Sequence, residues 1–161
     1  MTGNPRQRTH TSRRTNDQER WADLADLVLV IAREIQFRGY TDERAVQLTP
    51  SEGMVMRYLQ GEPAAPPSRI AAATGLQRTN LSTVLRGLEG KGLIERRSHP
   101  DDGRGVTVQR TERGKANYAL VRREWSAEVS AAAGGDTRNL GGALELLRTV
   151  QENLIATRPG S

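Results

Sequence analysis

Residues 68–110 contain the feature that most restricts the fold: two short amphipathic segments joined by a turn that contains one glycine and followed by two β-rich runs. Ser68 is expected to cap a short helix over Arg69–Thr74, which Gly75 ends. A second helix is expected from about Gln77 to Gly90. Two short helices joined by a turn that contains glycine form a helix-turn-helix.

The second helix has two chemically different faces. Its apolar residues fall on one side at helical spacing: Leu81, Val84, Leu85 and Leu88. The opposite side carries short hydroxyl groups and an arginine: Thr79, Ser82, Thr83 and Arg86. Such groups hydrogen-bond to base edges and phosphates, so we predict that this face contacts DNA; a solvated helix face is the alternative. Further candidates lie at the start of the helix: Gln77, Arg78 and Asn80.

A β-hairpin is predicted directly after this helix. Gly92–Arg97 and Val106–Arg110 read as strands, and the loop Ser98–Gly105 between them contains Pro, Asp and Gly. The loop is longer than a chain reversal requires, so we predict a protruding basic wing. Four residues around this module are predicted phosphate contacts: Ser68, Arg69, Arg96 and Arg97.

The segment before this module predicts another short helix. Thr49 caps it, Pro50 occupies its first turn, and Glu52 completes a capping box. The helix is expected to end at Gly61, and Gly61–Pro67 is predicted to be a non-helical connector. The chain begins with residues 1–15, which contain arginines and no acidic residue and lack apolar periodicity. They are predicted to form a disordered basic arm.

Three longer amphipathic helices flank the module. The first is expected over about 16–39, where apolar residues recur every three or four positions: Trp21, Leu24, Val28, Ile31 and Ile35. Two more are expected within about 112–157, broken at Gly134-Gly135. Their stripes are Tyr118, Val121, Trp125, Val129 and Ala132, then Leu140, Leu144, Leu147, Val150 and Leu154. A module of about 60 residues buries only part of three such stripes, so we expect a homodimer.

Composition excludes several functional classes. There is no cysteine, and His10 and His99 lie far apart, so neither a metal site nor a cofactor is expected. No paired acid and base, activated nucleophile or phosphate-binding loop emerges, which predicts that the chain is not an enzyme. The longest apolar run, Leu27–Ala32, is far below the about 20 residues that span a bilayer, so no membrane contact and a cytoplasmic location are expected. Residues 68–114 carry nine basic and five acidic residues, which favours an anionic partner.

The order of these elements resembles the MarR family of bacterial winged helix-turn-helix regulators. The matching segments are Leu48-Thr49-Pro50, Arg69–Gly75, Leu85–Arg96, Asp102-Gly103-Arg104 and Thr111-Glu112-Arg113-Gly114. The expected fold is mainly α with a small β-hairpin wing (α+β). It is a single domain over 16–161, with the winged helix-turn-helix at about 48–114 between dimerisation helices at about 16–39 and 112–157.

The resemblance implies a homodimer, built from the first and last helices, that binds double-stranded DNA. The recognition helix then enters the major groove, and the wing Arg104 reaches into the minor groove, with Asp102 holding the wing arginines. A narrow minor groove attracts arginine, and a two-fold protein requires a pseudo-palindromic site. There are departures: Arg110 stands where a leucine is usual, and Gly87 and Gly90 weaken the recognition helix by about 1 kcal/mol each relative to alanine.

Many relatives release DNA when a small aromatic or phenolic compound binds between the dimer helices and the DNA-binding lobe. The residues suited to such a pocket are Trp21, Tyr40, Met54 and Tyr58. Core packing is the commoner role of apolar residues at helical spacing, and it is the favoured interpretation here.

The leading hypothesis is therefore a sequence-specific transcriptional regulator, in this family most often a repressor, located at the nucleoid when bound. The alternative is an architectural DNA-binding protein without base specificity, whose affinity comes from counterion release. A winged helix used only for protein contact is a third hypothesis. Specific binders prefer their own site over random DNA by about a thousandfold or more, which separates the first two hypotheses.

Overall fold

The computed structural model describes residues 5–99 and 105–159 and separates the chain into two units, Met1–Gly39 and Tyr40–Ser161. The first unit contains one helix, α1 (Pro5–Arg38), and Gly39 follows it with φ of 68°. In the structure α1 includes residues 5–15, which the sequence pattern predicts to lie in a disordered arm. Proline is favourable in the first turn of a helix, and no glycine or proline interrupts the chain between Pro5 and Arg38.

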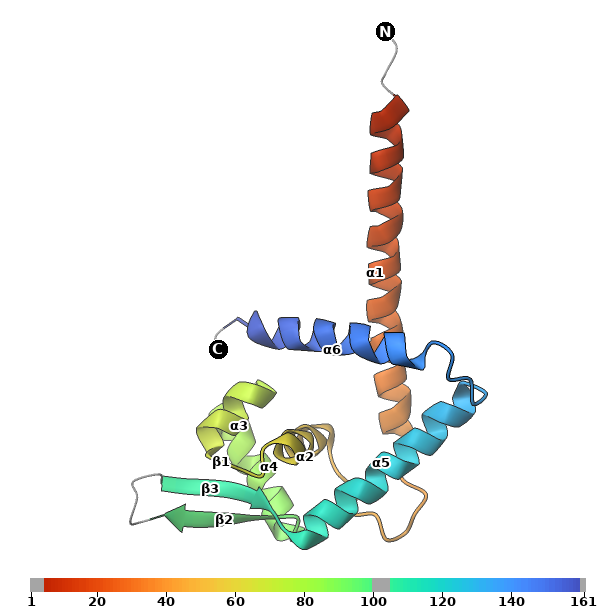
Figure 1. The fold of residues 1–161 in the computed structure, drawn as a ribbon. Helices are drawn as coiled ribbons and strands as arrows, with labels where there is room; N and C mark the ends of the chain where they lie inside the picture. Colours follow the sequence, from red (N-terminus) through yellow and green to blue (C-terminus); the bar gives the residue numbers. More distant parts are fainter. Residues whose placement is uncertain (1–4, 100–104, 160–161) are drawn as a thin grey trace. The chain divides into compact units, whose positions relative to one another are not determined.

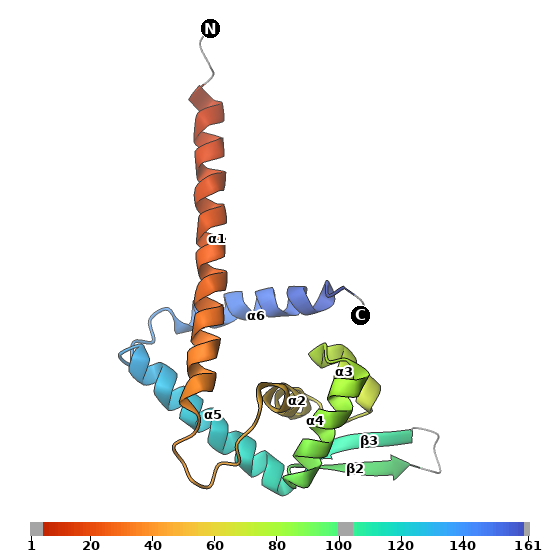
Figure 2. The ribbon, with the colours of Figure 1, turned by 180° about the vertical axis from the view of Figure 1, so that it is seen from behind.

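The second unit holds the predicted module and the two C-terminal helices (Figure 1). Its elements are α2 (Pro50–Gly61), β1 (Ala64–Ala65), α3 (Pro67–Thr74), α4 (Arg78–Gly90), β2 (Ile94–His99), β3 (Gly105–Arg110), α5 (Glu112–Ala132) and α6 (Leu140–Ala156). Seen from both sides, the hairpin β2–β3 projects beyond helices α2–α4 (Figures 1 and 2). The predicted fold class, a mainly helical winged helix-turn-helix, is confirmed.

The sheet has three antiparallel strands in the order β1-β3-β2. The hairpin pairs Ile94 with Arg110 and Arg96 with Val108. Strand β1 lies in the segment predicted to be only a connector, and it pairs Ala65 with Val108. Two extended residues between prolines are too short to show strand periodicity, but the free edge of β3 satisfies their backbone hydrogen bonds.

The helix starts differ in how well the sequence predicted them. The capping box of α2 is confirmed: the Glu52 N–H donates to Thr49 Oγ1 at 3.2 Å, and the Thr49 N–H donates to Glu52 Oε2 at 2.8 Å. The prediction that Ser68 caps α3 is wrong, because Pro66 is the N-cap and Ser68 lies in the first turn. Pro67 has a fixed φ suited to the first helical position, so the helix begins two residues earlier than predicted.

The hydrophobic core lies where α2, α3, α4, the sheet and α5 meet. Helix α4 contributes Leu81, Leu85 and Leu88, each at most 2% exposed. They pack in one cluster with residues from the other elements, among them Val55, Met56, Leu59, Ile70, Leu93, Val108 and Tyr118. The predicted apolar side of α4 is therefore buried, which leaves the other side of this helix outside.

A partly buried ion pair joins α2 to the C-cap of α4; its carboxylate is buried and its lysine side chain is 33% exposed. Glu52 is 4% exposed, and its Oε2 accepts a hydrogen bond from Lys91 Nζ at 2.6 Å. Lys91 Nζ also donates to the carbonyl oxygen of Gln47 at 2.8 Å. A Cβ atom on Gly87 would lie 2.8 Å from Glu52 Oε1, so the glycine in α4 makes room for this carboxylate.

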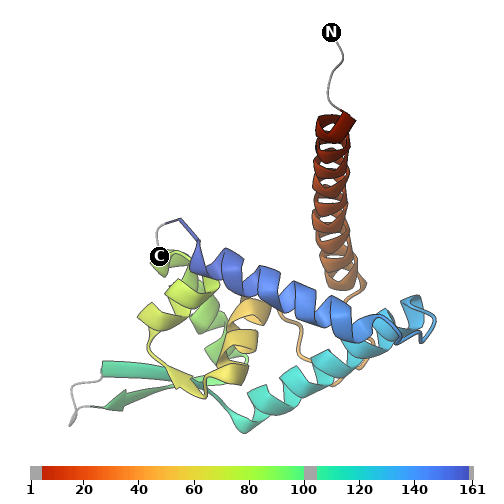
Figure 3. The ribbon, with the colours of Figure 1, turned by 45° about the horizontal axis from the view of Figure 1, so that its top comes forward.

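Helix α6 returns from the end of α5 toward α3 (Figure 3). After α6 ends, Arg158 Nη1 donates to the carbonyl oxygens of Ala72 and Ala73 at 3.0 and 3.3 Å. The large apolar side chains of α6 are 39–66% exposed: Leu140, Leu144, Leu146, Leu147, Leu154 and Ile155. Its apolar stripe thus lies largely uncovered in the single chain. None of the helices in the described part of the chain combines the length and apolar character that crossing a bilayer requires.

Replacing Gly114 with alanine should destabilise the second unit. The added Cβ would lie 1.9 Å from the backbone carbonyl oxygen of Leu93, so β2 and α5 would have to separate. We expect the free energy of unfolding to fall by about 3 kcal/mol, measured by chemical denaturation. Gly90→Ala is the control, because its Cβ meets nothing within 4 Å and alanine favours a helix by about 1 kcal/mol. Equal stability of the two variants would contradict this close packing.

Removing the cation of the partly buried pair should cost more than removing an exposed one. Lys91→Met leaves the buried Glu52 carboxylate without its charged partner, and we expect a loss of about 2 kcal/mol in the free energy of unfolding, because Lys91 is partly exposed and the Thr49 N–H still donates to Glu52. The matched control is Lys115→Met, whose pair with Glu112 has the same 2.6 Å distance but exposed side chains. That control should lose about 1 kcal/mol or less. Similar losses in the free energy of unfolding of both variants would show that the Glu52–Lys91 pair does not stabilise the fold.

Candidate nucleic-acid interface

The outward face of α4 presents the predicted recognition residues. All of them are exposed: Gln77, Arg78, Thr79, Asn80, Ser82, Thr83 and Arg86. Gln77 is the N-cap of α4 and the others lie within the helix. Burial of the three leucines on the opposite side fixes this orientation, so the structure bears out the predicted two faces.

The hydrogen bonds on this face are long. Arg86 Nη2 donates to Thr83 Oγ1 at 3.4 Å, and Arg86 Nε donates to the carbonyl oxygen of Ser82 at the same distance. Within the described part of the chain, neither Arg78 nor Arg86 forms an ion pair with a carboxylate. Both guanidinium groups are therefore available to an external acceptor.

Four predicted contact residues line one hollow of about 350 Å³, together with Pro67, Leu81 and Leu85. They are Ser68 of α3, Arg78 and Ser82 of α4, and Arg96 of β2. The hollow includes the first turn of α3, where backbone N–H groups and the helix dipole favour a negative charge. Two hydroxyl groups, two arginines and a helix N-terminus in one place suit a phosphate group.

All three predicted phosphate-contact arginines already have acidic partners. Exposed or half-exposed ion pairs join Arg69 to Glu62 at 3.6 Å, Arg96 to Glu89 at 3.3 Å and Arg97 to Glu95 at 2.8 Å. Sequence reasoning missed these pairs because the partners are set by folding. Such surface pairs contribute at most about 1 kcal/mol, so exchanging a carboxylate for a phosphate costs little.

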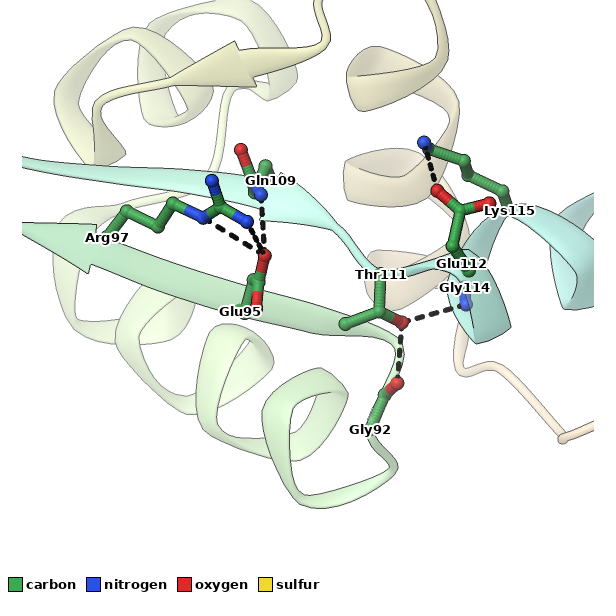
Figure 4. A network of polar contacts seen from close by, with 8 residues as sticks. All are labelled: Gly92, Glu95, Arg97, Gln109, Thr111, Glu112, Gly114 and Lys115. Atoms are coloured by element: carbon green, nitrogen blue, oxygen red, sulfur yellow. Dashed lines mark hydrogen bonds and ion pairs between the residues drawn. The ribbon is translucent and has the colours of Figure 1, made fainter.

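The base of the wing is held by two polar clusters (Figure 4). Glu95 Oε1 accepts hydrogen bonds from Gln109 Nε2 at 2.5 Å and Arg97 Nη2 at 2.8 Å, which links β2 to β3. Thr111 Oγ1 donates to the Gly92 carbonyl oxygen at 2.7 Å and accepts from the Gly114 N–H at 3.0 Å. These contacts fix the hairpin at its root, whereas the predicted wing contacts Asp102 and Arg104 lie outside the described residues.

The candidates for an effector pocket are divided between the two units. Trp21 is on α1 and is 55% exposed, whereas Tyr40, Met54 and Tyr58 belong to the second unit and are half-buried. Burial raises the pKa of Tyr40 and of Tyr58 above the usual tyrosine value. Tyr58 packs against the hydrophobic core, as the favoured core interpretation predicts for this residue.

A further residue that positions the interface was not found from the sequence. Asn117 on α5 is 6% exposed; its Oδ1 accepts from the Val46 N–H at 2.7 Å, and its Nδ2 donates to the Val46 carbonyl oxygen at 3.2 Å. It therefore anchors the segment before α2 to α5. A single asparagine in an otherwise polar stretch carries no sequence signal for such a role.

Comparison with known proteins decides the family. The family model described as MarR family matches residues 46–105, from the segment before α2 to the start of β3. The transcriptional repressor CouR, bound to a 23-mer DNA duplex, is 30% identical with a TM-score of 0.53. The match covers 65% of this chain and 75% of CouR. The chain belongs to the MarR family. It is a DNA-binding transcriptional regulator and not an enzyme.

Two other matches cover more of the chain. An uncharacterized HTH-type transcriptional regulator of Mycobacterium bovis is 27% identical over 138 residues, which are 84% of this chain and 90% of that protein. The structure of BpsR from Bordetella bronchiseptica, whose DNA binding is regulated by 6-hydroxynicotinic acid, has a TM-score of 0.59. It is 19% identical and the match covers 80% of this chain and 98% of BpsR, so it shows the shared fold.

The carboxyl group at the wing base offers a test by titration. The hydrogen bond from Gln109, followed by that from Arg97, holds the pKa of Glu95 below its usual value of 4.5. Because the pKa is lowered on folding, the ionised group stabilises the fold above that usual value, and this contribution is lost as the pH falls through the lowered pKa.

Gln109→Leu should therefore raise the pKa of Glu95 toward its usual value, as followed by the NMR chemical shift of its carboxyl carbon. The pKa of Asp136, which the hydrogen bond from Arg138 lowers in the segment between α5 and α6, serves as the internal control and should not move. An unchanged pKa of Glu95 in this variant would show that Gln109 does not stabilise the carboxylate.

Proposed function

We propose that this MarR-family regulator is a homodimeric, sequence-specific repressor that inserts α4 of each copy into the major groove. The observation that carries the proposal is the hollow that brings Ser68, Arg78, Ser82 and Arg96 together beside the exposed face of α4. A DNA phosphate in that hollow contacts the start of α3 and both arginines. It thereby places the helix against the groove.

Base edges are then read by the residues that point away from the core. Gln77 and Asn80 suit adenine, and Arg86 suits guanine. The hydroxyl groups of Thr79 and Thr83 can hydrogen-bond to either base. The wing residues Asp102 and Arg104 are proposed to act in the adjacent minor groove, with Arg104 in the groove and Asp102 holding the arginines. Arg69, Arg96 and Arg97 exchange their carboxylate partners for phosphates as the complex forms.

A second copy accounts for the apolar side chains that the single chain leaves exposed. Leu27, Val28, Val30 and Ile31 of α1 are 42–58% exposed, and the stripe of α6 is also uncovered. Exposed apolar area of this kind is buried in a dimer, and two-fold symmetry then requires a pseudo-palindromic operator. The protein would act in the cytoplasm, at the nucleoid when bound.

The proposal includes release from DNA by a small aromatic compound. Its support is the fold shared with BpsR, whose DNA binding is regulated by 6-hydroxynicotinic acid. The candidate contacts are Trp21, Tyr40, Met54 and Tyr58, of which Tyr58 also belongs to the core packing. Adding such compounds to a preformed protein–DNA complex tests release directly.

Arg78→Ala should weaken DNA binding and reduce the magnitude of the salt slope by about one, because one phosphate contact is lost. The matched control is Arg138→Ala, which removes the same charge from the segment between α5 and α6, where Arg138 pairs with Asp136. Fluorescence anisotropy with a duplex from upstream of the protein's own gene, at several salt concentrations, measures both quantities.

Arg104→Ala is expected to behave like Arg78→Ala, whereas Thr83→Ala should change base preference more than affinity. If Arg78→Ala, Arg104→Ala and Thr83→Ala all bound DNA as the wild type does, the proposed docking geometry would be refuted.

A further inference from the structure

A second hollow lies on the α5 side of the winged helix and shares no residue with the hollow beside α4. It has a volume of about 530 Å³ and is formed by the end of α2, the end of β3 and residues 115–126 of α5. Its polar lining comes mainly from Gln60, Arg110, Lys115, Arg122 and Arg123. Sites for small molecules have volumes of roughly 300–1,000 Å³, so this hollow is large enough for one.

The lining of this hollow is strongly basic. It contains four cationic side chains and no carboxylate. Lys115 pairs with Glu112, and Asp42 lies close enough to Arg123 for the two charges to attract each other. Arg110 and Arg122 form no ion pair with a described carboxylate. Like charges gathered in one hollow repel each other, and a bound anion removes that repulsion.

Arg110 brings to this hollow a buried donor that no acceptor in the described part of the chain satisfies. Its side chain is half-buried, and its Nε atom is buried without a hydrogen-bond partner among the described residues. Among the described residues, the one side-chain hydrogen bond of Arg110 is a long one, from Nη1 to Gln60 Oε1 at 3.5 Å. A partly buried guanidinium with so few acceptors is stabilised when an anion supplies them.

We infer that this hollow binds a small, multiply charged anion through a phosphate or pyrophosphate group. Arginine forks match the oxygens of a phosphate, and several of them around one hollow suit a group with more than one negative charge. Arg110 pairs with Ile94 in the hairpin, so the bound anion contacts the root of the wing. The site is defined by charge and shape in one chain and does not depend on the DNA-binding proposal.

The test is isothermal titration calorimetry of the full-length protein with pyrophosphate, at constant ionic strength and without DNA. The wild type should bind in a saturable manner. Arg110→Gln and Arg122→Gln should each weaken binding by about tenfold or more, the loss expected for one charge-assisted hydrogen bond. Arg138→Gln removes an equal charge elsewhere and should bind as the wild type does. Arg122 is exposed on α5, so its variant tests the site even if Arg110→Gln fails to fold.

Two results would overturn the inference. Equal weakening by Arg138→Gln, or no saturable binding at millimolar pyrophosphate, would mean that the hollow attracts anions only through the overall charge of the protein. If pyrophosphate does not bind but Arg122→Gln weakens duplex binding and lowers the salt slope, the phosphate source is the DNA backbone and not a free anion. Because the titration contains no DNA, its outcome is separate from that of the repressor proposal.

Discussion

Burial of one side of α4 against α2 is the constraint on which the rest of the interface depends. Leu81, Leu85 and Leu88 are almost completely inaccessible, so the helix cannot rotate without exposing them. The Glu52–Lys91 pair adds a charged contact at the end of the same helix, and an unpaired Glu52 carboxylate there is costly. Together these contacts hold the polar side of α4 outward, in the orientation that DNA recognition requires.

The other parts of the interface are positioned relative to this helix by short-range contacts. The turn at Gly75 sets α3 against α4, and the early start of α3 at Pro67 brings its N-terminus to the hollow beside Arg78. Thr111 joins the start of β2 to α5, so the wing leaves the domain in a fixed direction at its base. The polar, arginine-rich surface thus follows from a small apolar core that determines where each element begins.

Local signals in the sequence predicted most of this architecture. Apolar periodicity gave the two faces of α4, and the Thr49 capping box fixed the start of α2 to the residue. Long-range contacts left no such signal: strand β1 exists only because β3 offers it an edge, and Lys91 meets Glu52 only after folding. The same holds for the carboxylate partners of the predicted phosphate-contact arginines. From the sequence alone, Gly87 only weakens a helix. In the structure it provides the space that Glu52 occupies.

The central claim is that the outward face of α4 reads a particular DNA sequence. The most direct test is fluorescence-anisotropy binding of the purified wild-type protein to the duplex upstream of its own gene, beside a scrambled duplex of equal length and composition. The account predicts a preference for the native sequence of about a thousandfold or more at moderate salt. Equal and steeply salt-dependent binding to both duplexes would contradict sequence-specific recognition of this duplex. It would favour an architectural role instead.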